Sequence, residues 1–113
     1  MSPAHPDSIG RNGLTLTLTA GAAVEIVNGW GVVTWRVSVD RLETRSRKAV
    51  HLTVTHVRGT VAPYAAIVRH DRKTAIAISV EARLVRIGKH GADIEFTGPE
   101  EIGIRRAAAE SRT

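Results

Sequence analysis

Cysteine is absent from the 113 residues of this chain, which excludes disulfides and thiolate metal sites. Aromatic residues are scarce as well, with two Trp, one Tyr and one Phe. No apolar run approaches the roughly 20 residues that a membrane-spanning helix needs. The first dozen residues lack the positive start and the apolar core of a signal peptide. These absences predict a cytoplasmic protein that does not bind a membrane.

Positive charge is in excess. Sixteen Lys and Arg stand against eleven Asp and Glu, which gives a net charge of +5 and a pI near 10.7. Such a balance favours an anionic partner, because the summed field of the protein attracts polyanions without regard to fold. The charge therefore indicates nucleic acid as a partner class and carries no information about architecture.

Strict alternation of apolar and polar residues is the main structural pattern. In LTLTLT, Leu14, Leu16 and Leu18 alternate with threonines, as in a strand with one buried face. Similar stretches follow at 33–40, 49–57 and 92–97, and Trp35 alternates with valines as a core residue would. We predict an all-β domain of short antiparallel strands, either a barrel or a sandwich.

The predicted boundaries follow from punctuation and length. Residues 1–13 carry two prolines and two glycines and predict a flexible leader, 14–110 a single compact β domain, and 111–113 a tail. The stretch TAIAISVEARLVRI, residues 74–87, is interpreted as one strand, with a helix as the alternative. The alanine-rich RRAAAESR, from Arg105, predicts a short C-terminal helix.

Catalytic and metal-binding patterns are not found in the sequence. His51 and His56 are five residues apart on a predicted strand, so they would point to opposite faces and could not share a metal ion. The segment GKHGAD lacks the length and the Lys-Ser/Thr ending of a phosphate-binding P-loop. We expect no enzyme, no cofactor, no metal and no small-molecule substrate.

Basic residues gather near predicted strand ends. Charged strand ends can serve only to prevent edge-to-edge aggregation. Arg105 and Arg106 are the pair most suggestive of function, because the strand exit after Pro99 fixes their direction. Arginine's planar guanidinium suits phosphates and stacks on bases. We expect the segment after Pro99 to run along an open sheet margin and to present both arginines outward. The clusters are Arg41, Arg45, Arg47 and Lys48; Arg69, Arg72 and Lys73; Arg83, Arg86 and Lys89; and Arg105 and Arg106.

The stretch RLVRIGKHGADIEFTGPEEIGIRRAAAE, residues 83–110, resembles the carbon storage regulator (CsrA/RsmA) family of RNA-binding translational regulators. That family has two strands around a glycine-containing turn, an Ala-Pro, a Val-x-Val strand, and an arginine that opens a C-terminal helix. The family's opening motif, LxLxRxxGExxxI, can be laid over both LTLTLTAGAAVEI (14–26) and AIVRHDRKTAIAI (66–78), with His70 at the arginine position of the second. The resemblance therefore implies two copies, 14–65 and 66–110, folded as a pseudo-dimer.

The resemblance also implies a site and a function. The family's principal RNA-contacting arginine falls on Arg106, and Arg105 and Arg69 would assist it, with His70 and Arg72 nearby. The edge formed by the first and last strands of a copy would bind single-stranded loops of messenger RNA, with duplex DNA as a weaker alternative. The other class of function is a structural or interaction module, a homo-oligomer that buries Trp30 or a strand edge.

Overall fold

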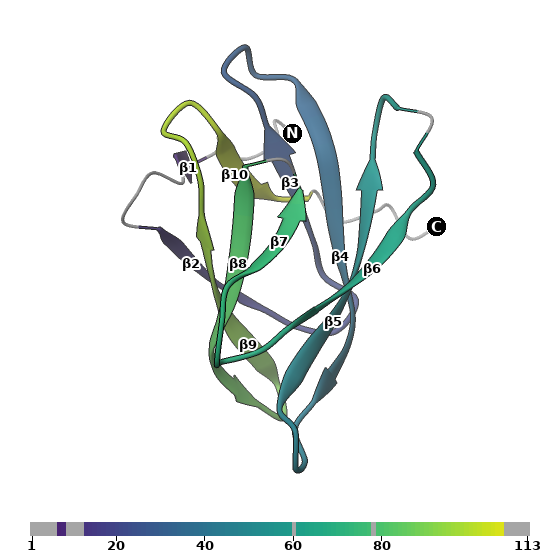
Figure 1. Cartoon of the computed structure of the whole chain (residues 1–113), viewed down its shortest axis with the longest axis vertical. Helices are drawn as coiled ribbons and strands as arrows, with labels where there is room; N and C mark the ends of the chain where they lie inside the picture. Colours follow the sequence, from purple (N-terminus) through teal and green to yellow (C-terminus); the bar gives the residue numbers. More distant parts are fainter. Residues whose placement is uncertain (1–6, 9–12, 60, 78, 108–113) are drawn as a thin grey trace.

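Every element in the described part of the chain is a β-strand (Figure 1). The computed structural model describes residues 7–8, 13–59, 61–77 and 79–107. The all-β prediction is confirmed. Of the predicted C-terminal helix, Arg105 and Arg106 belong to a strand, and 108–113 lie outside the described residues. The strands are β1 (Asp7–Ser8), β2 (Leu14–Leu18), β3 (Ala23–Val27), β4 (Val33–Glu43), β5 (Ala49–His56), β6 (Tyr64–Val68), β7 (Thr74–Ala77), β8 (Val80–Gly88), β9 (Gly91–Thr97) and β10 (Gly103–Arg106).

The strands form two antiparallel sheets, so the sandwich is the observed one of the two predicted arrangements. The six-stranded sheet has the order β1-β10-β3-β4-β5-β6, and the four-stranded sheet has the order β2-β9-β8-β7. The chain changes sheets between β1 and β2, between β2 and β3, between β6 and β7, and between β9 and β10. Each sheet therefore contains strands from both halves of the sequence.

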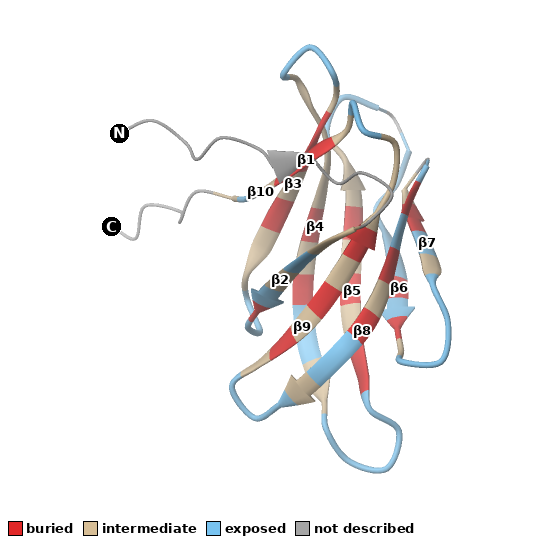
Figure 2. Cartoon of the chain, turned by 90° about the vertical axis from the view of Figure 1, so that its left-hand side faces the viewer, coloured by how far each residue is buried: buried red, intermediate tan, exposed pale blue. Residues whose placement is uncertain are grey.

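The core lies between the two sheets and is a single apolar cluster (Figure 2). Leu18 of β2, Phe96 of β9 and Ile104 of β10 are fully buried in it. The predicted inward faces are confirmed for β2, β5 and β9, where buried and more exposed residues alternate. Both halves of the sequence contribute to this core.

The stretch 74–87 is a hairpin, and our interpretation of it as one continuous strand was wrong. β7 pairs antiparallel with β8, and the chain reverses around Ser79, whose φ is +67°. Non-glycine residues with positive φ are uncommon, and serine gives no strong turn signal in sequence. The reversal keeps Ile76 and Val80 buried on the core face of the same sheet.

We expected β10 to run along an open sheet margin, and this prediction is wrong for two of its four residues. β1, at Asp7 and Ser8 of the predicted flexible leader, pairs antiparallel with β10. The partners are Ile104 and Gly103, while β3 pairs with the other side of β10. β10 is therefore an interior strand at these two residues. Residues 1–6 and 9–12 of the predicted leader lie outside the described part of the chain.

The two sheets share one strand order. Four strands of the larger sheet follow as β3-β4-β5-β6, and the smaller sheet repeats this order as β7-β8-β9-β2. The two middle pairings are β4 with β5 and β8 with β9. Each contains a register shift at an equivalent position, after Val39 in β4 and after Leu84 in β8. The residues paired across three neighbouring strands are Val39, Leu52 and Ala66 in one sheet and Leu84, Ile94 and Leu16 in the other. An internal two-fold relation thus connects β2–β5 with β6–β9.

Two strands, β10 and the short β1 that pairs with it, have no equivalent in this relation within the described part of the chain. β10 pairs with β3, but among the described residues no strand pairs with the equivalent edge of β7. Residues 57–63 follow β5 and lead directly into β6 in the same sheet. A counterpart of β10 would have to cross to the other sheet, pair with β7 and then return to β6. The sheets of a sandwich lie about 10 Å apart, so this connection is too short for the strand and the return. The outer edge of β7 is therefore the asymmetric feature of the molecule.

Candidate nucleic-acid interface

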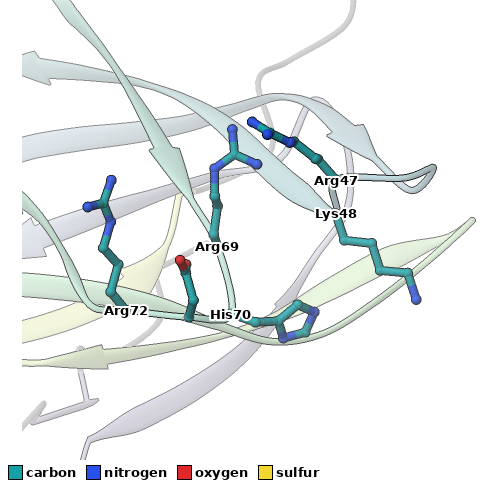
Figure 3. A pocket seen from close by; sticks show the side chains of 6 residues that line it. Arg47, Lys48, Arg69, His70 and Arg72 are labelled. Atoms are coloured by element: carbon teal, nitrogen blue, oxygen red, sulfur yellow. The ribbon is translucent and has the colours of Figure 1, made fainter.

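Two turns bring basic side chains together at one corner of the six-stranded sheet (Figure 3). Val50 near the start of β5 pairs with Val68 at the end of β6. The turn that precedes β5 therefore lies beside the turn that follows β6. Together they line a cavity of about 480 Å³ with Arg47, Lys48, Arg69, His70, Asp71 and Arg72.

The cavity is positively charged. Arg47 and Lys48 come from one turn and Arg69 and Arg72 from the other, and among the described residues of the lining Asp71 is the only acidic one. All of these side chains except Arg69 belong to exposed residues, and Arg69 is half-buried. Figure 3 shows the side chains of Arg69 and Arg72 extending on the same side of their turn. Guanidinium groups held in this way can bind several oxygen atoms of one polyanion.

A backbone hydrogen bond fixes the position of the turn at Arg69, and an ionised carboxylate lies near this residue. Its carbonyl accepts a hydrogen bond of 3.0 Å from the Leu84 amide, which ties the turn to the other sheet. Glu43 lies 2.9 Å from the His51 ring nitrogen. That hydrogen bond, with smaller contributions from Arg41, His51 and Arg69, lowers the pKa of Glu43, so this carboxylate stays ionised near Arg69.

Arg105 has a structural partner, in contrast to its predicted outward role. Its Nε donates a hydrogen bond of 2.8 Å to Glu25 on the neighbouring strand β3, and only 17% of its side chain is exposed. Glu25 also lies 4.0 Å from Arg36 of β4, so a row of three charged residues crosses three strands. The Arg105 guanidinium is therefore engaged within the sheet.

Arg106 is exposed, but it is distant in the sheet from three other residues of the predicted RNA site, Arg69, His70 and Arg72. It lies on β10, whereas Arg69, His70 and Arg72 follow β6 at the opposite edge. β3, β4 and β5 separate the two groups. The prediction that the first and last strands of a copy form one edge is wrong, because the chain exchanges strands between its halves. The predicted residues divide into a β10 pair and a cavity group.

His70 is not the counterpart of a residue in the first strand. When 14–26 and 66–78 are both aligned with the family motif, Leu16 is equivalent to Val68. The strand pairing in the two sheets makes Leu16 equivalent to Ala66 instead. By this register the position that the resemblance gave to His70 falls on Val68, which is buried. His70 instead lies in the exposed turn. A shift of two residues keeps every side chain on its face, so alternation could not reveal the error.

The two tryptophans have different surroundings. Trp30 is 89% exposed at the tip of the β3–β4 connection, where Asn28 Oδ1 accepts hydrogen bonds from the amides of Trp30 and Val32. This tip lines a second cavity together with Glu100 and Glu101. The two carboxylates would repel phosphates, so Trp30 is a poor base-stacking platform.

Trp35 packs at the margin of the core. Its ring centroid lies 4.4 Å from that of His56 and 6.3 Å from that of Tyr64. The backbone of Gly59 presses on the same histidine, since a Cβ there would lie 1.7 Å from His56 Nδ1. Sequence analysis missed this cluster, because its members come from three separate segments. A glycine in a connection gave no signal of such a close approach.

Comparison with known proteins adds no identification. No family model, curated protein or solved structure matches the chain. Among the described residues, no helix is long and apolar enough to cross a membrane. The same residues contain no group of three or more His, Cys, Asp and Glu that could hold a metal ion. The fold and the basic cavity are thus the main basis for assigning a function.

Proposed function

We propose that this chain is a CsrA-like RNA-binding regulator in which both halves of a pseudo-dimer belong to one polypeptide. The shared strand order of the two sheets supports the two-copy interpretation, because β2–β5 and β6–β9 are equivalent strand by strand. Such a regulator would act on messenger RNA in the cytoplasm. The interior of the sandwich is apolar among the described residues, so binding would take place on the surface.

The observation that carries the proposal is the basic cavity between the β4–β5 and β6–β7 turns. Arg47 and Lys48 from one segment and Arg69 and Arg72 from another line this cavity, and only folding brings the two segments together. Single-stranded RNA suits such a site, because its phosphates can follow a curved surface and its unstacked bases can lie on guanidinium planes. Arg106 would provide a second, separate contact, and Arg105 would hold β10 in place.

Simultaneous replacement of Arg69 and Arg72 by alanine is expected to weaken RNA binding about tenfold. RNA binding by the double variant would release fewer counterions, because phosphate contacts are lost. The salt slope for single strands is about 0.7 per phosphate contact. The slope of log affinity against log salt should therefore fall by about 1.4. Fluorescence anisotropy with a GGA-containing hairpin over a range of salt concentrations measures both quantities.

The matched control replaces two basic residues outside the cavity, Arg58 and Arg86. Both are exposed, and the double variant loses the same formal charge. Its affinity should stay within about twofold of the parent, because neither residue lines the cavity. A general field, which depends on net charge and not on place, would instead weaken both double variants equally. Equal weakening in both double variants, or tighter binding to duplex DNA than to the hairpin, would refute the RNA site.

A further inference from the structure

The outer edge of β7 is the strand edge that the internal two-fold relation leaves without a partner. On the equivalent strand β3, β10 pairs along this edge and places Ile104 in the core. β7 lies at one side of the sandwich in Figure 2, across the molecule from β10. Within the described residues, β8 alone pairs with β7. Exposed edges of this kind can pair with an added strand.

One hydrogen bond already reaches this edge from outside the sheet. The Tyr64 hydroxyl, on β6 of the other sheet, donates to the carbonyl of Ile76. Burial raises the pKa of Tyr64, so the hydroxyl stays protonated as a donor. On the equivalent side of the molecule, β10 lies against β3 as a full strand. Tyr64 thus satisfies the Ile76 carbonyl from the opposite sheet.

The charges at the two equivalent edges differ in an informative way. On the β10 side, Arg105 is bound to Glu25, and Arg36 follows on the next strand. The positions equivalent to Glu25 and Arg36 are Ala75 and Glu81, which pair with each other. Glu81 is exposed and makes no ion pair with the residues that the structure describes.

We propose that the β7 edge binds an extended segment of a partner protein with an apolar-x-apolar-Arg pattern. The segment would lie antiparallel to β7, as β10 lies against β3, with its arginine opposite Ala75. Strands are about 4.8 Å apart, so Glu81 would be about 10 Å from the added strand. Because Ala75 has only a methyl group, an arginine could extend over it to the Glu81 carboxylate.

The test uses the full chain and a blocked peptide, GPEEIGIRRA, which has the sequence of residues 98–107. Isothermal titration should detect binding, and amide exchange at 74–77 should slow at least tenfold when the peptide is bound. Glu81→Arg should weaken binding about tenfold. A peptide with glutamate in place of its first arginine should restore the affinity of Glu81→Arg. This exchange of charges tests the register and not only the contact.

Three controls separate strand addition from other modes of binding. Glu101→Arg reverses an exposed carboxylate at another site and should leave peptide affinity unchanged. A peptide with proline in place of the glycine between its two isoleucines cannot donate a ladder hydrogen bond and should not bind, because Gly103 and Arg105, like Ala107, direct their amides toward β3. Tyr64→Phe removes the bond to the Ile76 carbonyl and should change peptide affinity by less than about twofold, because the equivalent residue Ile26 makes no ladder hydrogen bond to β10.

Several results would overturn the proposal. They are unchanged amide exchange at 74–77 with the peptide in excess, equal losses in Glu81→Arg and Glu101→Arg, or a stable dimer whose β7 amides are protected without peptide. The last result would assign the edge to a second copy of the chain. None of these outcomes bears on RNA binding, because the β7 edge does not line the basic cavity.

Discussion

Phe96→Ala is expected to lower the free energy of unfolding by about 3–5 kcal/mol, the usual range for removing a buried aromatic ring. Phe96 is the largest of the fully buried side chains and stands at the middle strand pairings of the four-stranded sheet. Its neighbours across the strands are Leu14 of β2 and Ala82 of β8. A cavity there would separate two strands from the core, and the small Ala82 cannot fill it. Urea denaturation followed by circular dichroism measures the loss.

The matched control is Trp30→Ala, which removes an aromatic ring that is 89% exposed. Its free energy of unfolding should change by less than about 0.5 kcal/mol, as for ordinary surface substitutions. A loss below about 1 kcal/mol for Phe96→Ala would mean that the two sheets do not enclose this ring.

Ile104→Ala is expected to destabilise the protein by about 2–5 kcal/mol. Ile104 is fully buried and is the residue through which β10 enters the core between β1 and β3. Thermal unfolding measures the loss. Amide exchange should speed up most at β10, because the Arg105–Glu25 ion pair cannot hold the strand alone. A partly exposed ion pair contributes about 1 kcal/mol or less.

Ile67→Ala provides the same chemical change at another strand edge. Ile67 lies on β6 and is 41% exposed, so its truncation should cost clearly less than that of Ile104. Similar losses in the two variants would contradict the docking of β10 through Ile104. Faster exchange spread evenly over all strands would contradict it as well.

The faces of most strands could be predicted from sequence, because burial between two sheets selects period two directly. Leu14, Leu16 and Leu18 alternate with threonines, and the same pattern identified Ile94 and Phe96 as core. Positions where the backbone departs from this period were not predicted. The reversal at Ser79 depends on one positive φ in a stretch of otherwise unbroken alternation.

The candidate site was predicted only in part, because strand pairing between distant segments decides which basic residues meet. Arg69 and Arg72 were recognised within one cluster and Arg47 within another. Only the pairing of Val50 with Val68 shows that the two clusters form one cavity. The carboxylate partner of Arg105 was likewise hidden, since Glu25 is 80 residues away in the chain.

The internal two-fold relation within a single chain has an evolutionary consequence. In a pair of identical subunits, each substitution occurs at two places at once, so a change that suits one end of the assembly also alters the other. A single gene product with two related halves is free of that constraint. Here one end is closed by β10 and the other ends at β7 and Tyr64. Selection can therefore act on each end independently and assign the two ends different tasks.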